Sequence, residues 1–219
     1  VDIKSTGTTT IRANGKDPDP GYTTLTAVNV DTNSKVNIHG KSILVEAISE
    51  SEDTSSIAIY AYSRSGAAPA VITIGDESTE DITVSAKGNS GSYGIQTMES
   101  NVELIADKVR ITSSAYGIHV GNNTQLEKPE ANGASTIIRA NDTIINADSC
   151  GILAFSNGLV DISGNLTVKA RDVLNVRGYS TTNINTDGKG TVKLDGNINF
   201  STPGGEHNSG DIIDAYVNI

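Results

Sequence analysis

Aromatic residues are scarce in this sequence: they make up 4% of its 219 residues, with two phenylalanines, seven tyrosines and no tryptophan. Sugar-cleaving grooves tend to offer aromatic rings on which a substrate stacks, so the absence of tryptophan argues against such a groove. Cysteine is almost absent as well, and the single thiol, Cys150, excludes a disulfide within the chain. Its place at the start of a predicted strand favours a buried and unreactive side chain.

Long apolar runs, helical periodicity and an excess of positive charge are also missing. No run approaches the roughly 18 apolar residues of a membrane-spanning helix, and no long stretch repeats its apolar residues with a period of about 3.6. The 16 basic residues face 26 acidic ones, which gives a net charge of −10. We therefore expect no binding to nucleic acid, which requires a Lys/Arg-rich surface, and no direct insertion of this segment into an anionic membrane.

What the sequence does contain is a short amphipathic unit, seen best at 160–170, VDISGNLTVKA. Side chains alternate between the two faces of a β-strand, so one face of this unit is apolar and the other is polar. A Gly-Asn corner at Gly164 and Asn165 separates two short strands. The predicted inward residues are Val160, Ile162, Leu166, Val168 and Ala170, and the predicted outward residues are Asp161, Ser163, Thr167 and Lys169.

This unit recurs along the whole chain. Seven copies lie at 1–13, 36–47, 72–86, 102–112, 136–147, 160–170 and 192–200. A third short strand accompanies each pair, at 27–30, 58–62, 94–97, 117–120, 151–155, 173–176 and 212–216. The second apolar residue of each copy recurs at steps of 24 to 36 residues, at Ile3, Ile38, Ile74, Leu104, Ile138, Ile162 and Leu194. A repeat of this length is typical of stacked arrays.

Constant strands with a varying step predict an all-β solenoid: a right-handed parallel β-helix over 1–219, with three short strands per coil and about seven coils. Loop insertions are expected at two of the three corners, for example from Tyr179 to Lys189. A β-sandwich is the alternative fold, but it requires antiparallel strands. Neither end shows the polar cap of a natural solenoid and the chain starts at Val1 without a methionine, so we expect a segment of a longer protein.

The coils at 36–47 (VNIHGKSILVEA), 160–170 (VDISGNLTVKA) and 192–200 (VKLDGNINF) resemble those of autotransporter passenger domains, the exported β-helical adhesins and toxins of Gram-negative bacteria. The resemblance covers the whole chain and rests on repeat style and composition. It implies an extracellular segment on the bacterial cell surface, displayed by an outer-membrane barrel, that mediates adhesion, aggregation or biofilm contact. The partners it implies are a host or bacterial surface protein or glycan, with self-association as a further possibility.

Two other functions remain open. A β-helical polysaccharide lyase or hydrolase would group carboxylates on one face, whereas the pairs Glu52-Asp53 and Glu80-Asp81 fall in predicted turns. The histidines His39, His119 and His207 have no second ligand at metal spacing and fit outward polar positions. We therefore expect no enzyme activity, no metal and no cofactor. The remaining alternative is a structural stalk that binds nothing.

The tyrosines are the most distinctive outward residues. Tyr93 and Tyr116 both precede Gly-Ile in successive coils, and Tyr60 and Tyr62 lie on the same kind of strand. A stacked ladder that shields a corner is one interpretation of this pattern. The other is a contact patch for a surface glycan or protein, since tyrosine favours interfaces. These four residues are the candidate binding residues.

Overall fold

The computed structural model of the chain describes residues 1–15, 24–50, 54–64, 66–88, 91–122, 133–177, 180–185, 190–201 and 216–219. These residues form one 17-stranded sheet and no helix. Every strand pairing among them is parallel. The prediction of an all-β, parallel architecture is confirmed, and the antiparallel β-sandwich is excluded. A membrane-spanning helix is not found among the described residues.

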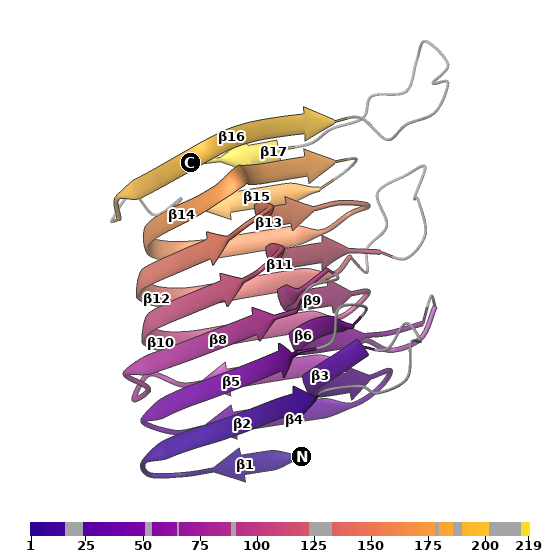
Figure 1. Cartoon of the computed structure of the whole chain (residues 1–219), viewed down its shortest axis with the longest axis vertical. Helices are drawn as coiled ribbons and strands as arrows, with labels where there is room; N and C mark the ends of the chain where they lie inside the picture. The colour runs from indigo at the N-terminus through magenta and orange to yellow at the C-terminus, as the bar shows by residue number, and fades with distance from the viewer. Residues whose placement is uncertain are drawn as a thin grey trace.

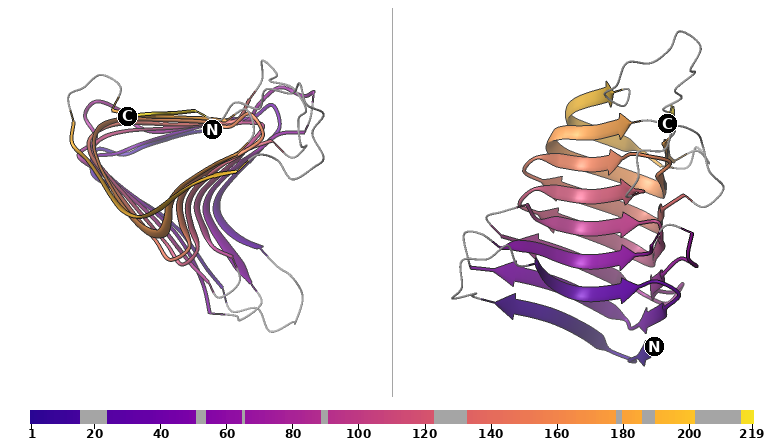
Figure 2. Two further views of the ribbon diagram at one scale, coloured as in Figure 1. Left: turned by 90° about the horizontal axis from the view of Figure 1, so that it is seen from above. Right: turned by 90° about the vertical axis from the view of Figure 1, so that its right-hand side faces the viewer.

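The strands lie above one another from the N-terminal to the C-terminal end of the molecule (Figure 1). Seen along this stack, they surround a single interior with three sides (Figure 2, left). The buried aliphatic residues form a continuous core that runs through this interior. The sheet is thus open at its two ends and has an architecture compatible with a solenoid.

The pairings fall into three stacks of strands, which we call columns one, two and three. Column one contains β1 (Asp2–Lys4), β4 (Lys35–His39), β7 (Val71–Gly75), the starts of β10 (Asn101–Ser113), β12 (Ser135–Ala147) and β14 (Leu159–Arg177), then β15 (Thr181–Ile184) and β17 (Tyr216–Asn218). Column two contains β2 (Thr8–Gly15), β5 (Ser42–Ser49), β8 (Asp81–Lys87), later parts of β10, β12 and β14, and the start of β16 (Val192–Ser201). Column three contains β3 (Thr24–Asp31), β6 (Ser55–Tyr62), β9 (Tyr93–Met98), β11 (Tyr116–Gly121), β13 (Cys150–Ala154) and the ends of β14 and β16.

Aliphatic residues stack in register along each column. In column one Ile38, Ile74, Leu104, Ile138 and Ile162 lie opposite one another in successive strands, and all five are buried. Burying each such side chain contributes about 1.5–3 kcal/mol as an upper estimate. Because each of these residues contacts the coil above and the coil below, the core is stabilised by neighbours in the stack rather than within one coil.

The predicted register of 160–170 is confirmed for most of its residues. Val160, Ile162, Leu166 and Val168 are buried, and their polar neighbours are partly or fully exposed. Ala170 is only half-buried, contrary to the prediction. The pairing of β14 with β16 shifts register directly after Lys169, so the strict alternation ends there.

The last predicted copy lies in a different column from the one expected. Leu194 lies opposite Val168 in column two, whereas the prediction placed it above Ile162 in column one. The position above Ile162 is occupied by Ile184 of β15, in a stretch that we expected to be a loop insertion. Of the predicted strand at 212–216, residues 212–215 lie outside the described residues, and Tyr216 pairs in column one instead of column three.

Glycine marks the tight corners between columns. Gly164, between columns one and two, has a positive φ of 78°, a conformation that favours glycine. A side chain at Gly164 would overlap the carbonyl oxygen of Ala140 in the coil below. There β12 carries one more residue than β14, since the register shifts between Arg139 and Asp142. The Gly-Asn corner read from the sequence is therefore a place where two coils approach too closely for a Cβ atom.

Two buried hydroxyls among the described residues, those of Thr143 and Thr182, make no hydrogen bond. Thr143 is 1% exposed, lies in register between Val109 and Leu166, and its Oγ1 has no partner. We expect Thr143→Val to raise the free energy of unfolding by about 1–2 kcal/mol, because valine keeps the shape and removes the unpaired polar atom. Urea-induced unfolding would measure the change.

The matched control is Thr136, whose Oγ1 lies 2.9 Å from the Oγ1 of Thr97 in the same core. Thr136→Val leaves the buried Thr97 hydroxyl without its partner, so we expect a loss of about 1–2 kcal/mol instead. Equal effects of the two substitutions would contradict the account of hydroxyl pairing in this core.

Candidate functional site

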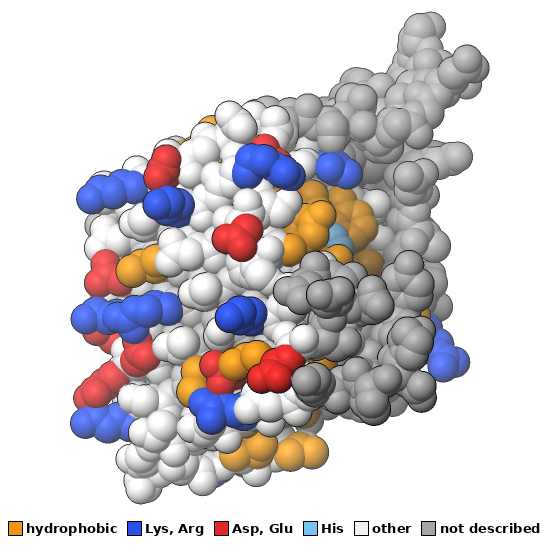
Figure 3. All heavy atoms as spheres, viewed as in Figure 1, with side chains coloured by type: hydrophobic (Ala, Val, Ile, Leu, Met, Phe, Trp, Pro, Cys, Tyr) orange, Lys and Arg blue, Asp and Glu red, His pale blue; other side chains and the backbone are white. Residues whose placement is uncertain are grey.

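Aromatic side chains gather on the outer face of column three. Tyr60 and Tyr62 come from β6, Tyr93 from β9, Tyr116 and His119 from β11, and Phe155 directly follows β13. We call these six residues the aromatic strip. In the view of Figure 3, hydrophobic side chains gather around a histidine on the right of the molecule, whereas charged side chains are spread over the left.

The Tyr-Gly-Ile sequence explains why the rings of Tyr93 and Tyr116 point outward. A Cβ atom at Gly94 would lie 2.5 Å from Ile111 Cγ2 and 2.7 Å from the carbonyl oxygen of Gly117. Only glycine permits this approach, which lets the strand bend inward immediately after the tyrosine. The following isoleucine then enters the core, and the tyrosine ring stays on the surface.

Tyr93 and Tyr116 stack face to face. They are opposite each other in register, and their ring centroids lie 5.0 Å apart with planes 9° from parallel. This separation matches the ~4.8 Å distance between strands, so the ring planes lie across the stack direction and the ring edges point outward. Burial raises the pKa of the Tyr93 hydroxyl, which therefore stays protonated near neutral pH. Each ring covers one face of the other, and the ring edges and hydroxyl groups remain available to a binding partner.

Tyr60 and Tyr62 form a second pair, with centroids 6.0 Å apart and planes 28° from parallel. Tyr60 lies opposite Gln96 rather than opposite Tyr93. Burial also raises the pKa of Tyr60. The structure thus brings the four predicted residues to one face as two stacked pairs, and it shows no ring contact between the pairs within the described residues.

His119 and Phe155 complete the strip, although neither was predicted to join the tyrosines. The His119 ring lies 4.8 Å from Phe155, 5.2 Å from Tyr93 and 5.7 Å from Tyr116. Its Nδ1 atom lies 3.2 Å from the Gln96 side-chain amide. His119 was predicted to be an outward polar residue; it does point outward, but aromatic rings surround it. Strict alternation would put His119, three residues after Tyr116, on the opposite face; Gly117 and Ile118 are both buried, and this break in the alternation brings His119 to the outer face.

The environment of His119 disfavours its charged form. Burial among the rings, with a smaller contribution from the Arg177 cation, lowers its pKa to about 4. The ordinary pKa of histidine is about 6.5. Between about pH 6.5 and about pH 4, the unfolded chain therefore binds a proton at His119 that the folded chain does not. Stability therefore falls as the pH falls through this window, by up to about 3 kcal/mol.

We expect His119→Asn to remove this part of the pH dependence. Urea-induced unfolding of the chain and of the variant, from pH 7 to pH 4, would measure it. The difference in unfolding free energy between the two proteins should shrink as the pH falls, since only the unmodified chain is destabilised by protonation at this site. A constant difference across the window would contradict the proposed environment of His119.

The other candidate groups in the described part of the chain include Cys150 and His39. Cys150 is buried, and burial raises the pKa of its thiol to about 12. His39 lies between two carboxylates, with Nδ1 3.0 Å from Asp76 and Nε2 3.5 Å from Asp2. No group of three or more metal-ligating side chains is found in the described part of the chain. His207 and the pair Glu52-Asp53 lie outside the described residues.

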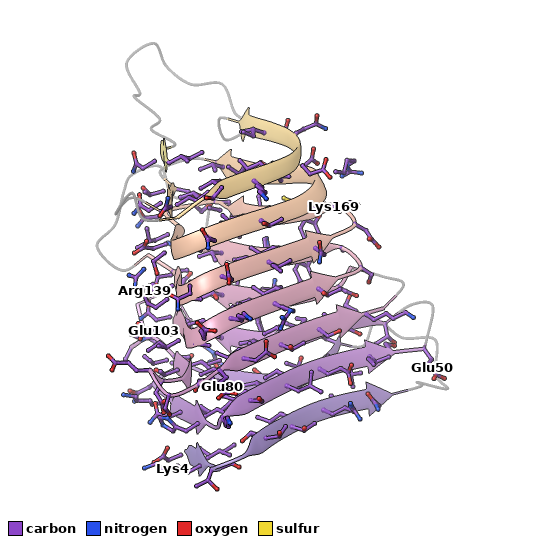
Figure 4. The ribbon with its side chains drawn as sticks, turned by 90° about the vertical axis from the view of Figure 1, so that its left-hand side faces the viewer. Lys4, Glu50, Glu80, Glu103, Arg139 and Lys169 are labelled. Atoms are coloured by element: carbon purple, nitrogen blue, oxygen red, sulfur yellow. The ribbon has the colours of Figure 1, made fainter. Side chains whose placement is uncertain are left out.

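Several charged side chains elsewhere form ion pairs between neighbouring coils. Lys41 contacts Glu80 at 3.1 Å, Arg110 contacts Asp81, and Arg139 contacts Asp161 at 2.7 Å. The second predicted acidic pair, Glu80-Asp81, is thus engaged with cations. Figure 4 shows Glu80, Glu103, Arg139 and Lys169 on the outside of successive strands, away from the core.

Comparison with known proteins assigns no family to this chain. No family model, no curated protein and no solved structure matches the chain.

Proposed function

We propose that this chain is part of a bacterial cell-surface adhesin of the autotransporter passenger type, which attaches to a host or bacterial surface protein or glycan. The observation that carries the proposal is the aromatic strip, whose four tyrosines gather on one outer face of an otherwise polar sheet surface. Tyrosine offers a rigid apolar ring and a polar hydroxyl, a combination that is enriched at binding interfaces.

The proposal includes the finer architecture. We take the three columns as the sides of a right-handed parallel β-helix, with three strands in each coil and about seven coils in the segment. Such a scaffold is rigid because each coil is hydrogen-bonded to the coils on either side. Its outward residues differ from coil to coil, so a surface such as the aromatic strip can change while the inward residues keep the scaffold.

A bead-attachment assay tests the adhesin function. Beads coated with the chain should adhere to a bacterial lawn or to epithelial cells, and Tyr93→Phe with Tyr116→Phe should reduce adhesion by about tenfold through loss of the two hydroxyl groups. Phenylalanine keeps the ring stack, so folding should survive. The matched control replaces Thr112 and Asn146, exposed neighbours on the outer face of column two, by alanine.

The outcomes separate the adhesin from the two other functions. Adhesion that is equal for the tyrosine variant, the control variant and the unmodified chain would contradict a binding role for Tyr93 and Tyr116. Beads that never adhere would favour a structural stalk. Release of reducing ends from a polysaccharide by the chain would instead favour a β-helical lyase or hydrolase.

A further inference from the structure

The aromatic strip is rich in hydrogen-bond donors and in positive electrostatic potential. An aromatic ring has a negative face and a positive edge, and the stacking of Tyr93 on Tyr116 leaves the edges outward. Each phenol group adds a hydroxyl donor, and the Gln96 amide lies beside them. Neutral His119 and the protonated hydroxyl of Tyr93 bring no negative charge to this part of the strip at neutral pH.

A free cation lies at the C-terminal side of the strip. Arg177 follows Val176, which pairs with Ala154 of β13, so Arg177 lies in the coil next to Phe155. Its charge acts on both His119 and Cys150, which places the guanidinium group near the rings. It donates one hydrogen bond to the Asn175 side chain at 2.9 Å. Among the described residues no carboxylate pairs with it.

Two described carboxylates near the strip, Asp172 and Asp31, already accept hydrogen bonds. Asp172 accepts hydrogen bonds from Arg171 at 3.3 Å and from Asn199 at 2.8 Å. Asp31, at the other side, accepts hydrogen bonds from the backbone and hydroxyl of Thr32. The Thr32 hydrogen bonds lower the pKa of Asp31, and its negative charge acts on Tyr60. The part of the strip that favours an anion is therefore the C-terminal part, where Tyr93, Tyr116 and His119 lie near Arg177.

We propose that the aromatic strip and Arg177 form a binding surface for an acidic glycan, a polysaccharide that carries carboxylate or sulfate groups. This deepens the proposed adhesin function and rests on it. Equivalent groups on the strip repeat at the ~4.8 Å strand spacing, a repeat close to the length of one sugar unit in an extended polysaccharide. The acidic group would accept hydrogen bonds from Arg177 and from tyrosine hydroxyls, and charge-assisted bonds of this kind are the stronger ones.

Titration calorimetry with defined polymers tests the proposal. The probes are hyaluronan oligosaccharide for carboxylate, dextran sulfate for sulfate, neutral dextran, and poly-glutamate as an acidic peptide. Saturable binding to either acidic polysaccharide, which weakens as salt is raised, together with no binding to dextran, is the expected result. The polymer that binds more tightly identifies the preferred acidic group.

One arginine variant and one lysine variant make the test specific. Arg177→Gln should weaken binding by about tenfold, the effect of losing one charge-assisted contact. Lys169→Gln removes the same charge from an exposed position on column two and should leave binding unchanged. The proposal is overturned if neither polysaccharide binds, if poly-glutamate binds equally well, or if both variants weaken binding to the same extent. Tyrosine-dependent bead adhesion without acidic-glycan binding would overturn this inference alone and leave the adhesin function standing.

Discussion

Val168→Asp should abolish the folded state under conditions in which Lys169→Asp is tolerated. Val168 is fully buried and lies in register between Ile145 and Leu194, with Gly151 packed against its methyl group. A carboxylate at this position loses its hydration and gains no partner, and the valine contacts are lost as well. We expect a loss of more than about 4 kcal/mol, a large share of the stability of a typical domain.

The adjacent residue provides the control because it lies on the opposite face of the same strand. Lys169 is exposed and lies opposite Asn146, so Lys169→Asp should change the unfolding free energy by less than about 1 kcal/mol. Circular dichroism during urea titration of both variants would measure the difference. Comparable losses from the two variants would show that the inward and outward faces of β14 have been exchanged.

Gly164→Ala should be the most damaging of the glycine substitutions at turns. The methyl group would require a φ of 78°, which is strained for alanine, and would overlap the carbonyl oxygen of Ala140. Backbone strain of this kind contributes about 1–2 kcal/mol, and forcing an atom into a packed site adds about 1–3 kcal/mol. We expect a total loss of about 2–5 kcal/mol in urea-induced unfolding.

Gly66 separates these two contributions. Its φ of 77° is nearly identical, but a Cβ atom there would have no heavy atom within 4 Å. Gly66→Ala should therefore show the backbone strain alone, a loss of about 1–2 kcal/mol. If the two alanine variants are equally destabilised, the close approach of the coils at Ala140 contributes nothing, and only the backbone conformation at Gly164 matters.

The inward face of the sheet could be predicted well from the sequence because it depends on a single rule. A two-residue alternation of aliphatic side chains, repeated in successive coils, specifies which residues are buried. The pairing of Ile38 with Ile74 and of Ile138 with Ile162 follows from that alternation.

The assignment of the last repeat failed for a physical reason. Strands of all three columns obey the same alternation, so pattern alone cannot say to which column a strand belongs. The stretch at 192–200 resembles 160–170, including a glycine corner, but Gly196 turns the chain from column two to column three. β15 was missed because only Thr182 and Ile184 of its four residues are buried, and one of them is polar.

The candidate site could be predicted only in part. The repeated Tyr-Gly-Ile identified Tyr93 and Tyr116 as neighbours, since equivalent positions in adjacent coils must lie one strand apart. The approach of Phe155 and Arg177 to His119 depends on how long side chains lean across the sheet surface. That packing depends on side-chain conformations and on the lengths of the intervening corners, neither of which a repeat pattern specifies.

The weakness of β15 has a consequence for the way the molecule opens. β15 contributes four residues to its coil, the Thr182 hydroxyl is buried without a partner, and Ile198 in the same coil is 46% exposed. In a stacked array, each coil is held by its neighbours, so opening starts where a coil has the fewest favourable contacts. The amide protons of 181–185 and 190–201 should therefore exchange with solvent faster than those of the central strands, and unravelling should proceed from this coil toward β10 and β12.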